Sequence, residues 1–172
     1  MVLLGFIFYL ADAGKLKQRI LKTLKIVPLE EFESKNKDVK FALKYTPFQT
    51  GAYVVVIEYH PKIDMIRVVA SIAIGKKLQD NFKGKKDAEK NEINEIFSKT
   101  LRARSFTRVT AKDFTVLEGY KLLFQQNFSA QMLFDAVTEA VFVIQDAVTL
   151  LVEADQSLKV PKVSEATKNM FQ

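Results

Sequence analysis

The chain has 172 residues, of which 48% are hydrophobic and 14 are Phe, and its formal net charge is +6. This length and apolar content predict one globular domain with a substantial core over residues 1–172, and they exclude a largely disordered chain. Because the chain has no cysteine, disulfides, thiolate metal sites and cysteine nucleophiles are excluded, and a cytoplasmic protein is expected.

The positive charge is concentrated in the first two-thirds of the chain. Residues 1–112 carry 22 basic and 12 acidic side chains, a net charge of +10, whereas residues 113–172 carry 4 and 8, a net charge of −4. Such an imbalance favours an acidic partner for the basic part. A Lys-rich surface that only keeps the protein soluble is the simpler interpretation.

Residues 1–11 form an apolar segment that ends before Asp12. A membrane-spanning helix needs about 20 apolar residues, so we expect no membrane span. Residues 11–13 loosely resemble a signal-peptide cleavage site, but no basic residue precedes the apolar run. We expect a buried or interface segment, with a misplaced translation start as the alternative.

Residues 12–27 predict the first helix, because Leu16, Ile20, Leu24 and Val27 recur on one helical face and Pro28 closes the segment. Residues 30–37 show neither a helical nor a strand period and are expected to be a connection. Alternating apolar residues then predict a three-stranded meander over residues 39–45, 53–59 and 65–74.

A charged stretch to residue 86 precedes a predicted helix over residues 87–101, which has Ile93, Ile96, Phe97 and Leu101 on one face. Two strands are expected next, at residues 105–110 and 114–124, with a bulge at Gly119.

The strongest prediction is a long helix over residues 130–153. Ser129 has the character of an N-cap, and Phe128 and Leu133 have the spacing of a hydrophobic staple. Residues 155–172 are expected to be a loosely attached tail.

These elements predict an α+β fold: a helix, a three-stranded antiparallel meander, a helix, two strands and a long C-terminal helix packed on the sheet. The order resembles the type III secretion chaperone-like fold, including uncharacterised prokaryotic families that share it. No sequence motif accompanies the resemblance, which spans residues 16–153. It implies a small homodimer that binds extended polypeptides, although secretion chaperones are usually acidic and this chain is basic.

No catalytic or cofactor motif is present. The six glycines form neither a dinucleotide-binding fingerprint nor a phosphate loop. His60 lies beside Glu58 and Asp64 near a predicted turn, and these three side chains are the best candidates for contacting an ion. Zinc sites usually need more His or Cys ligands than this, so a turn histidine is the preferred interpretation. We expect no metal, no cofactor and no enzymatic activity.

The best binding signal is the segment from Arg102 to Arg108. Strand alternation would place Arg104, Phe106 and Arg108 on one face, where guanidinium groups could contact phosphates and the ring could stack on a base. The alternative, which we favour, is that Phe106 faces the core while the arginines extend past it.

The long helix carries more apolar surface than one sheet can cover, and Phe142 lies in the middle of its polar stripe. A homodimer interface that includes Phe142 would explain both features. The first helix or the apolar segment before it could instead cover the excess within the chain.

The sequence therefore predicts a non-catalytic protein-binding module, with a chaperone-like homodimer that receives a polypeptide partner as its more specific form. The second choice is a nucleic-acid or polyanion binder that uses the basic part. Phosphate binding would weaken steeply with salt, whereas polypeptide binding would not.

Overall fold

The structure, a computed structural model, describes residues 2–84, 95, 97–109, 115–125, 127–154 and 162–170. The elements are, in order, α1 (Val2–Thr23), β1 (Glu30–Phe32), β2 (Phe41–Tyr45), β3 (Tyr53–His60), the 3-10 helix η1 (Pro61–Ile63), β4 (Met65–Ala73), α2 (Lys76–Lys83), β5 (Thr107–Val109), β6 (Val116–Phe124), α4 (Ala130–Ala154) and α5 (Glu165–Met170). Residues 97–103 are also helical. The class is α+β, as predicted.

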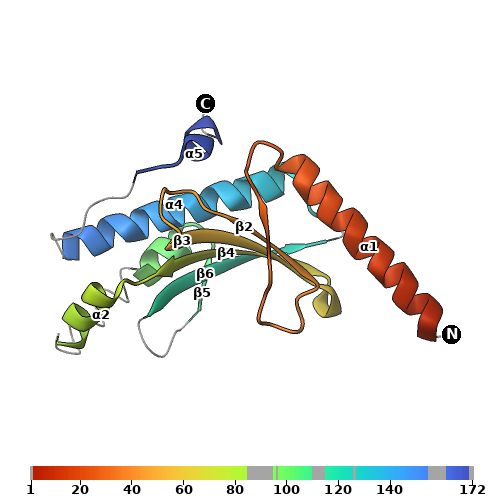
Figure 1. The fold of residues 1–172 in the computed structure, drawn as a ribbon, viewed down its shortest axis with the longest axis horizontal. Coiled ribbons are helices and arrows are strands. Elements are labelled where there is room, and N and C mark those ends of the chain that lie inside the picture. Colours follow the sequence, from red (N-terminus) through yellow and green to blue (C-terminus); the bar gives the residue numbers. More distant parts are fainter. Residues whose placement is uncertain are drawn as a thin grey trace.

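The strands form one antiparallel sheet in the order β1-β2-β3-β4-β6-β5. The sheet is curved (Figure 1). The predicted meander is confirmed as β2, β3 and β4, and the last two predicted strands are confirmed as β5 and β6. Residues 105 and 106 of the predicted strand 105–110 lie outside β5, since Ser105 adopts a positive φ of 57° in the turn before it, and residue 110 lies outside the described part of the chain.

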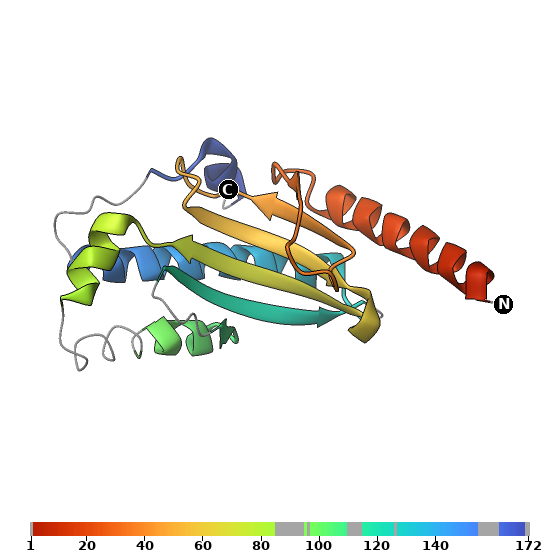
Figure 2. The same ribbon diagram turned by 60° about the horizontal axis from the view of Figure 1, so that its bottom comes forward.

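The helices cover one face of the sheet, and α4 runs behind the strands in Figure 2. Buried residues of α1, α2, α4, α5 and helical residues 97–103 all belong to one cluster with the inward side chains of the strands. The predicted N-cap is confirmed, because the Ser129 hydroxyl accepts a hydrogen bond from the Met132 amide (3.1 Å). Phe97 and Leu101 are buried as predicted, whereas residues 85–94 and 96 lie outside the described part of the chain.

The excess apolar surface of α4 is covered within the chain, which was one of the two alternatives. Buried residues of α1, from Ala13 to Leu24, share its cluster. The polar stripe of α4 is confirmed as outward-facing, and Met132, an apolar residue of the same helix, is 45% exposed.

Three elements differ from the sequence prediction. α1 is one helix that begins at Val2 and passes through Asp12, because nothing in the apolar run interrupts a helix. β1 forms at Glu30–Phe32, where all three residues are exposed and so leave no alternation to detect. α2 forms within the charged stretch. Among described residues, no helix is both long and apolar enough to cross a membrane.

The bulge predicted at Gly119 is wrong. β4 and β6 pair in unbroken register through Ala70 and Gly119. Leu101 packs directly on this position, so a Cβ atom there would overlap its side chain. Glycine is therefore required by a close approach of the helix to the strand and not by a bulge.

The prediction of a loosely attached tail is also wrong for residues 162–170, while residues 155–161 lie outside the described part of the chain. Val163 forms a bridge with Phe48. Thr167 is buried, donates a hydrogen bond to the Pro47 carbonyl (2.6 Å) and bonds to the Tyr45 hydroxyl. Hydrogen bonds between polar groups hold this segment on the helix-covered face, and such groups leave no hydrophobic period in the sequence.

Candidate interaction surface on the open face of the sheet

The second face of the sheet has its own small cluster, to which no described helix contributes. Ala42, Val56 and Val69 form it, with Val39, Val54 and Tyr120 packed against them. We call this side the open face. The alternation in the predicted strand 39–45 would put Val39 on the same side as Leu43, but Val39 lies on the open face because it precedes β2 and is not part of its alternation.

Antiparallel register arranges the open face in rows, because paired residues point to the same side. One row runs through five strands: Phe32, Ala42, Glu58, Arg67 and Leu122. Its ends are apolar and exposed, and its centre holds an ion pair. The face therefore presents separated apolar ends around a charged middle.

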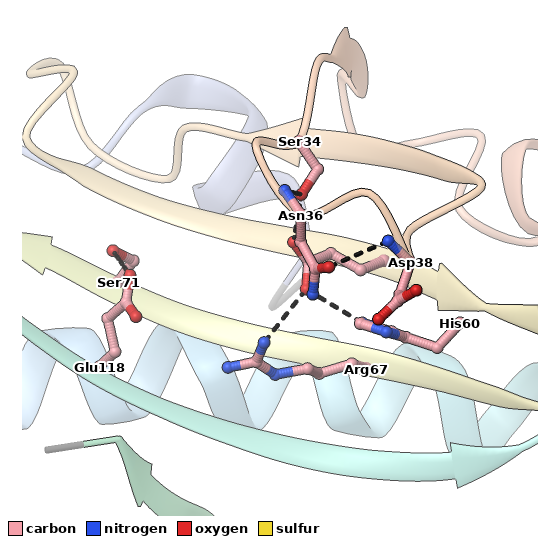
Figure 3. A network of polar contacts seen from close by, with 8 residues as sticks. Ser34, Asn36, Asp38, His60, Arg67, Ser71 and Glu118 are labelled. Atoms are coloured by element: carbon pink, nitrogen blue, oxygen red, sulfur yellow. Dashed lines mark hydrogen bonds and ion pairs between the residues drawn. The ribbon is translucent and has the colours of Figure 1, made fainter. Parts of the chain in front are cut away.

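Glu58 is the centre of a polar cluster whose other members, Ser34, His60 and Arg67, are labelled in Figure 3. Glu58 is only 8% exposed, and its carboxylate has three partners. Oε1 accepts a hydrogen bond from the Ser34 hydroxyl (3.2 Å), and Oε2 lies 3.3 Å from both His60 Nε2 and Arg67 Nη1. The Arg67 guanidinium also lies 4.5 Å from the centre of the Tyr120 ring. A buried carboxylate held this way is a fixed, neutralised charge.

The neighbouring charges are also paired. Ser71 donates a hydrogen bond to Glu118 (2.9 Å), and Lys44 pairs with Glu30 (3.1 Å). At the rim, the Lys62 ammonium donates a hydrogen bond to Asp38, which holds the pKa of that carboxyl below its ordinary value and raises the pKa of Lys62. The charges at the centre of the open face are therefore already paired within the chain.

An unpaired strand edge borders the open face. β5 pairs only with residues 118–120 of β6, so among the described strands residues 121–124 have no neighbour on the side away from β4. Leu122 is 41% exposed and Phe124 57% exposed, and both point to the open face. Ile63, at the adjacent turn before β4, is 56% exposed. The Phe124 carbonyl already accepts hydrogen bonds from the Asn127 and Phe128 amides (3.2 and 3.1 Å). Apart from that group, this corner joins an unpaired strand edge to exposed apolar side chains.

Arg104 and Phe142, both predicted to bind a partner, contact each other. The Arg104 guanidinium forms hydrogen bonds to Asp146 (2.9 and 3.1 Å) and lies 5.0 Å from the centre of the Phe142 ring. Arg104 and Asp146 line a shallow groove between helical residues 97–103 and α4. Packing within the chain thus accounts for Phe142 in the polar stripe, and the expected homodimer stays a prediction without this support.

Phe106 faces the core, which is the alternative that the sequence analysis favoured, so Arg104, Phe106 and Arg108 do not form one binding face. Phe106 is only 3% exposed and belongs to the core, so it cannot stack on a base. Arg108 is half-buried, donates a hydrogen bond to the Ser98 hydroxyl (2.8 Å), and has a pKa lowered by burial. The alternation failed because Arg104 precedes β5 and lies in a turn.

The possible ion-binding trio is only partly assembled. Glu58 and His60 are neighbours, as predicted from their positions on one strand face, but Asp64 lies 3.5 Å from the Tyr59 hydroxyl instead. No cluster of three or more His, Cys, Asp or Glu side chains suited to a metal occurs among the described residues.

Sequence reasoning missed Arg67, Leu122 and Phe124 as surface residues. A signal for Arg67 existed, since a charged residue interrupts the otherwise apolar run 65–70 on the side that should face solvent. Leu122 and Phe124 gave none, because alternating apolar residues on both faces of β6 look like a fully buried strand.

Comparison with known proteins identifies the fold but no family. No family model matches the chain, and no curated protein matches it either. A solved structure of an uncharacterized protein from Methanothermobacter thermautotrophicus is similar, with a TM-score of 0.64 and 12% sequence identity. The match covers 81% of this chain and 96% of the other. At this identity, the similarity supports the α+β fold alone.

Proposed function

We propose that the protein is a non-catalytic protein-binding module that takes up an extended segment of a partner polypeptide along the unpaired end of β6. The observation that carries the proposal is the combination at residues 121–124 of an unpaired strand edge with the exposed side chains of Leu122 and Phe124. A sheet edge offers unpaired N–H and C=O groups that an added strand can satisfy.

The chemistry of the open face supports a polypeptide over a polyanion. In strand addition the backbone supplies affinity, and alternate side chains supply specificity. Leu122 and Phe124 occupy such alternate positions and would contact every second side chain of the partner. The charged groups beside them already have partners within the chain. Glu58 pairs with Arg67, and Glu118 accepts a hydrogen bond from Ser71.

The resemblance to chaperone-like proteins that bind extended polypeptides agrees with this proposal, as does the absence of a catalytic motif in the sequence. The polyanion alternative loses its specific site, because Phe106 is in the core. A homodimer is not required, since the β6 edge lies within one chain.

The test is a peptide selected from a displayed library and measured by fluorescence anisotropy. Two methylated peptides are compared, one with the odd-numbered and one with the even-numbered backbone nitrogens methylated. Only one of them should lose binding, because the N–H groups of only one set point at β6. Leu122→Asp and Phe124→Asp should each weaken binding at least about tenfold, since each removes one buried apolar contact.

Phe32→Asp is the matched control, because Phe32 is an exposed apolar residue (42%) at the opposite end of the same row of the open face. It should leave the affinity unchanged. A selected peptide that tolerates methylation of both sets, or that is indifferent to Leu122→Asp and Phe124→Asp, would exclude strand addition at β6.

A further inference from the structure

The helix α1 has two halves of different character. Its second half packs on the core through Ala13, Leu16, Ile20 and Leu24. Its first half runs away from the sheet and from α4 in both views (Figures 1 and 2). Residues 2–10 of this half contain no charged residue. An apolar helical segment therefore extends beyond the folded body.

A basic segment follows it directly. Between Asp12 and Glu30 the chain has no acidic residue and five basic ones, Lys15, Lys17, Arg19, Lys22 and Lys25. Helical spacing puts Lys15 and Lys22 on the side opposite the buried residues. Arg19 lies on the same stripe, but its guanidinium reaches back to donate a hydrogen bond to the Phe128 carbonyl (3.1 Å). Lys15, Lys22 and Lys25 are exposed and have no ion-pair partner within the part of the chain that the structure describes.

We propose that α1 docks the protein on the surface of an anionic lipid bilayer, with its apolar half in the headgroup region and its lysines on lipid phosphates. Interfacial helices combine apolar residues with Lys and Arg in this way. Nine residues make about 14 Å of helix, roughly half of the hydrocarbon thickness, which suits lying in the interface.

Charge distinguishes a bilayer from a second copy of the chain as the occupant. Two copies meeting through α1 would bring their unpaired lysines together, with the acidic Glu58 and Glu118 of the open face already engaged. An anionic surface attracts the same lysines. This inference does not rest on peptide binding at β6, which uses a different surface.

The first test uses the absence of tryptophan from the chain. Phe8→Trp places a single reporter in the apolar half. Its emission should shift to the blue, and brominated lipids should quench it, with vesicles of equimolar phosphatidylcholine and phosphatidylglycerol but not with phosphatidylcholine alone. Phe124→Trp, on the open face, should report no change with either vesicle.

The second test removes charge and measures cosedimentation with the same vesicles. Lys15→Gln, Lys22→Gln and Lys25→Gln combined should weaken binding about fivefold for each lysine. The matched control combines Lys35→Gln, Lys37→Gln and Lys40→Gln, which removes equal charge from exposed positions between β1 and β2. The control should retain most of the binding, and circular dichroism should show that both variants keep their helix.

Three results would overturn the proposal. One is wild-type protein that sediments with neither vesicle, and another is equal loss of binding in the two triple variants, which would mean attraction by net charge alone. The third is light scattering in which Phe8→Asp dissociates an oligomer while vesicle binding persists, which would assign the apolar half to a second copy.

Discussion

The contact between Leu101 and Gly119 gives a prediction whose magnitude follows from the geometry. A Cβ atom added at position 119 would lie 3.2 Å from Leu101 Cγ and closer still to both of its methyl carbons. Leu101 is fully buried, so it cannot swing into solvent to make room. Overpacking of this kind costs about 1–3 kcal/mol.

A second effect opposes it. The backbone at Gly119 does not have a positive φ, so alanine fits the strand conformation. Alanine also restricts the unfolded chain more than glycine does, which would raise the unfolding free energy by about 0.4–1 kcal/mol. The steric cost is larger, and Gly119→Ala should therefore lose about 1–2 kcal/mol of unfolding free energy. For a chain of this size, that lowers the melting temperature by about 2–8 °C.

Calorimetry and urea denaturation measure this loss, and a double-mutant cycle tests its cause. Leu101→Val shortens the side chain that Ala would meet and should itself cost about 1 kcal/mol. The double variant should lose less unfolding free energy than the two single variants lose together, by at least about 0.5 kcal/mol. Additive free energies, or an alanine variant as stable as wild type, would refute the close-approach explanation.

Three further predictions concern charged groups. Glu58→Gln should lower the unfolding free energy by about 1–3 kcal/mol in urea denaturation, because Arg67 loses its carboxylate; an unchanged midpoint would contradict this. Phe142→Leu should lower the unfolding free energy by about 0.5–1 kcal/mol through the lost contact with Arg104, and light scattering should give an unchanged molar mass. A lower molar mass would indicate that Phe142 lies in a subunit interface. NMR titration should give Asp38 a carboxyl pKa below its ordinary value of 3.8, and Lys62→Gln should bring it back. The stabilisation from this pair is present above that ordinary value and is lost as pH falls through the lowered pKa, so wild type and variant should converge in strong acid.

The sequence predicted the elements that a hydrophobic period defines. The meander and α4 were found because Leu43 and Tyr45 alternate with outward residues and because α4 repeats its apolar stripe along a helix of about seven turns. β1 and α5 were missed because they are held by pairing with distant segments and by hydrogen bonds, such as that from Thr167 to the Pro47 carbonyl. Such contacts leave no periodic trace in the chain.

The candidate site was harder to predict than the fold. Arg104, Phe106 and Arg108 looked like one surface because alternation was extended beyond the strand, but the chain turns at Ser105, where φ is positive. The unpaired edge of β6 depends on how short β5 is, which is a property of two segments together. Only the proximity of Glu58 and His60 followed from a local rule.

The docking of α5 has a consequence for how the protein is made. The buried Tyr45 hydroxyl bonds to Thr167, which is 122 positions further along the chain. The end of β2 therefore has no partner for that group while the ribosome is still translating α4. During synthesis this corner must remain hydrated and open, and it closes only after residues 162–170 have left the exit tunnel. Translation order therefore leaves the end of β2, the first strand of the meander, to be completed by a residue that is synthesised 122 positions later.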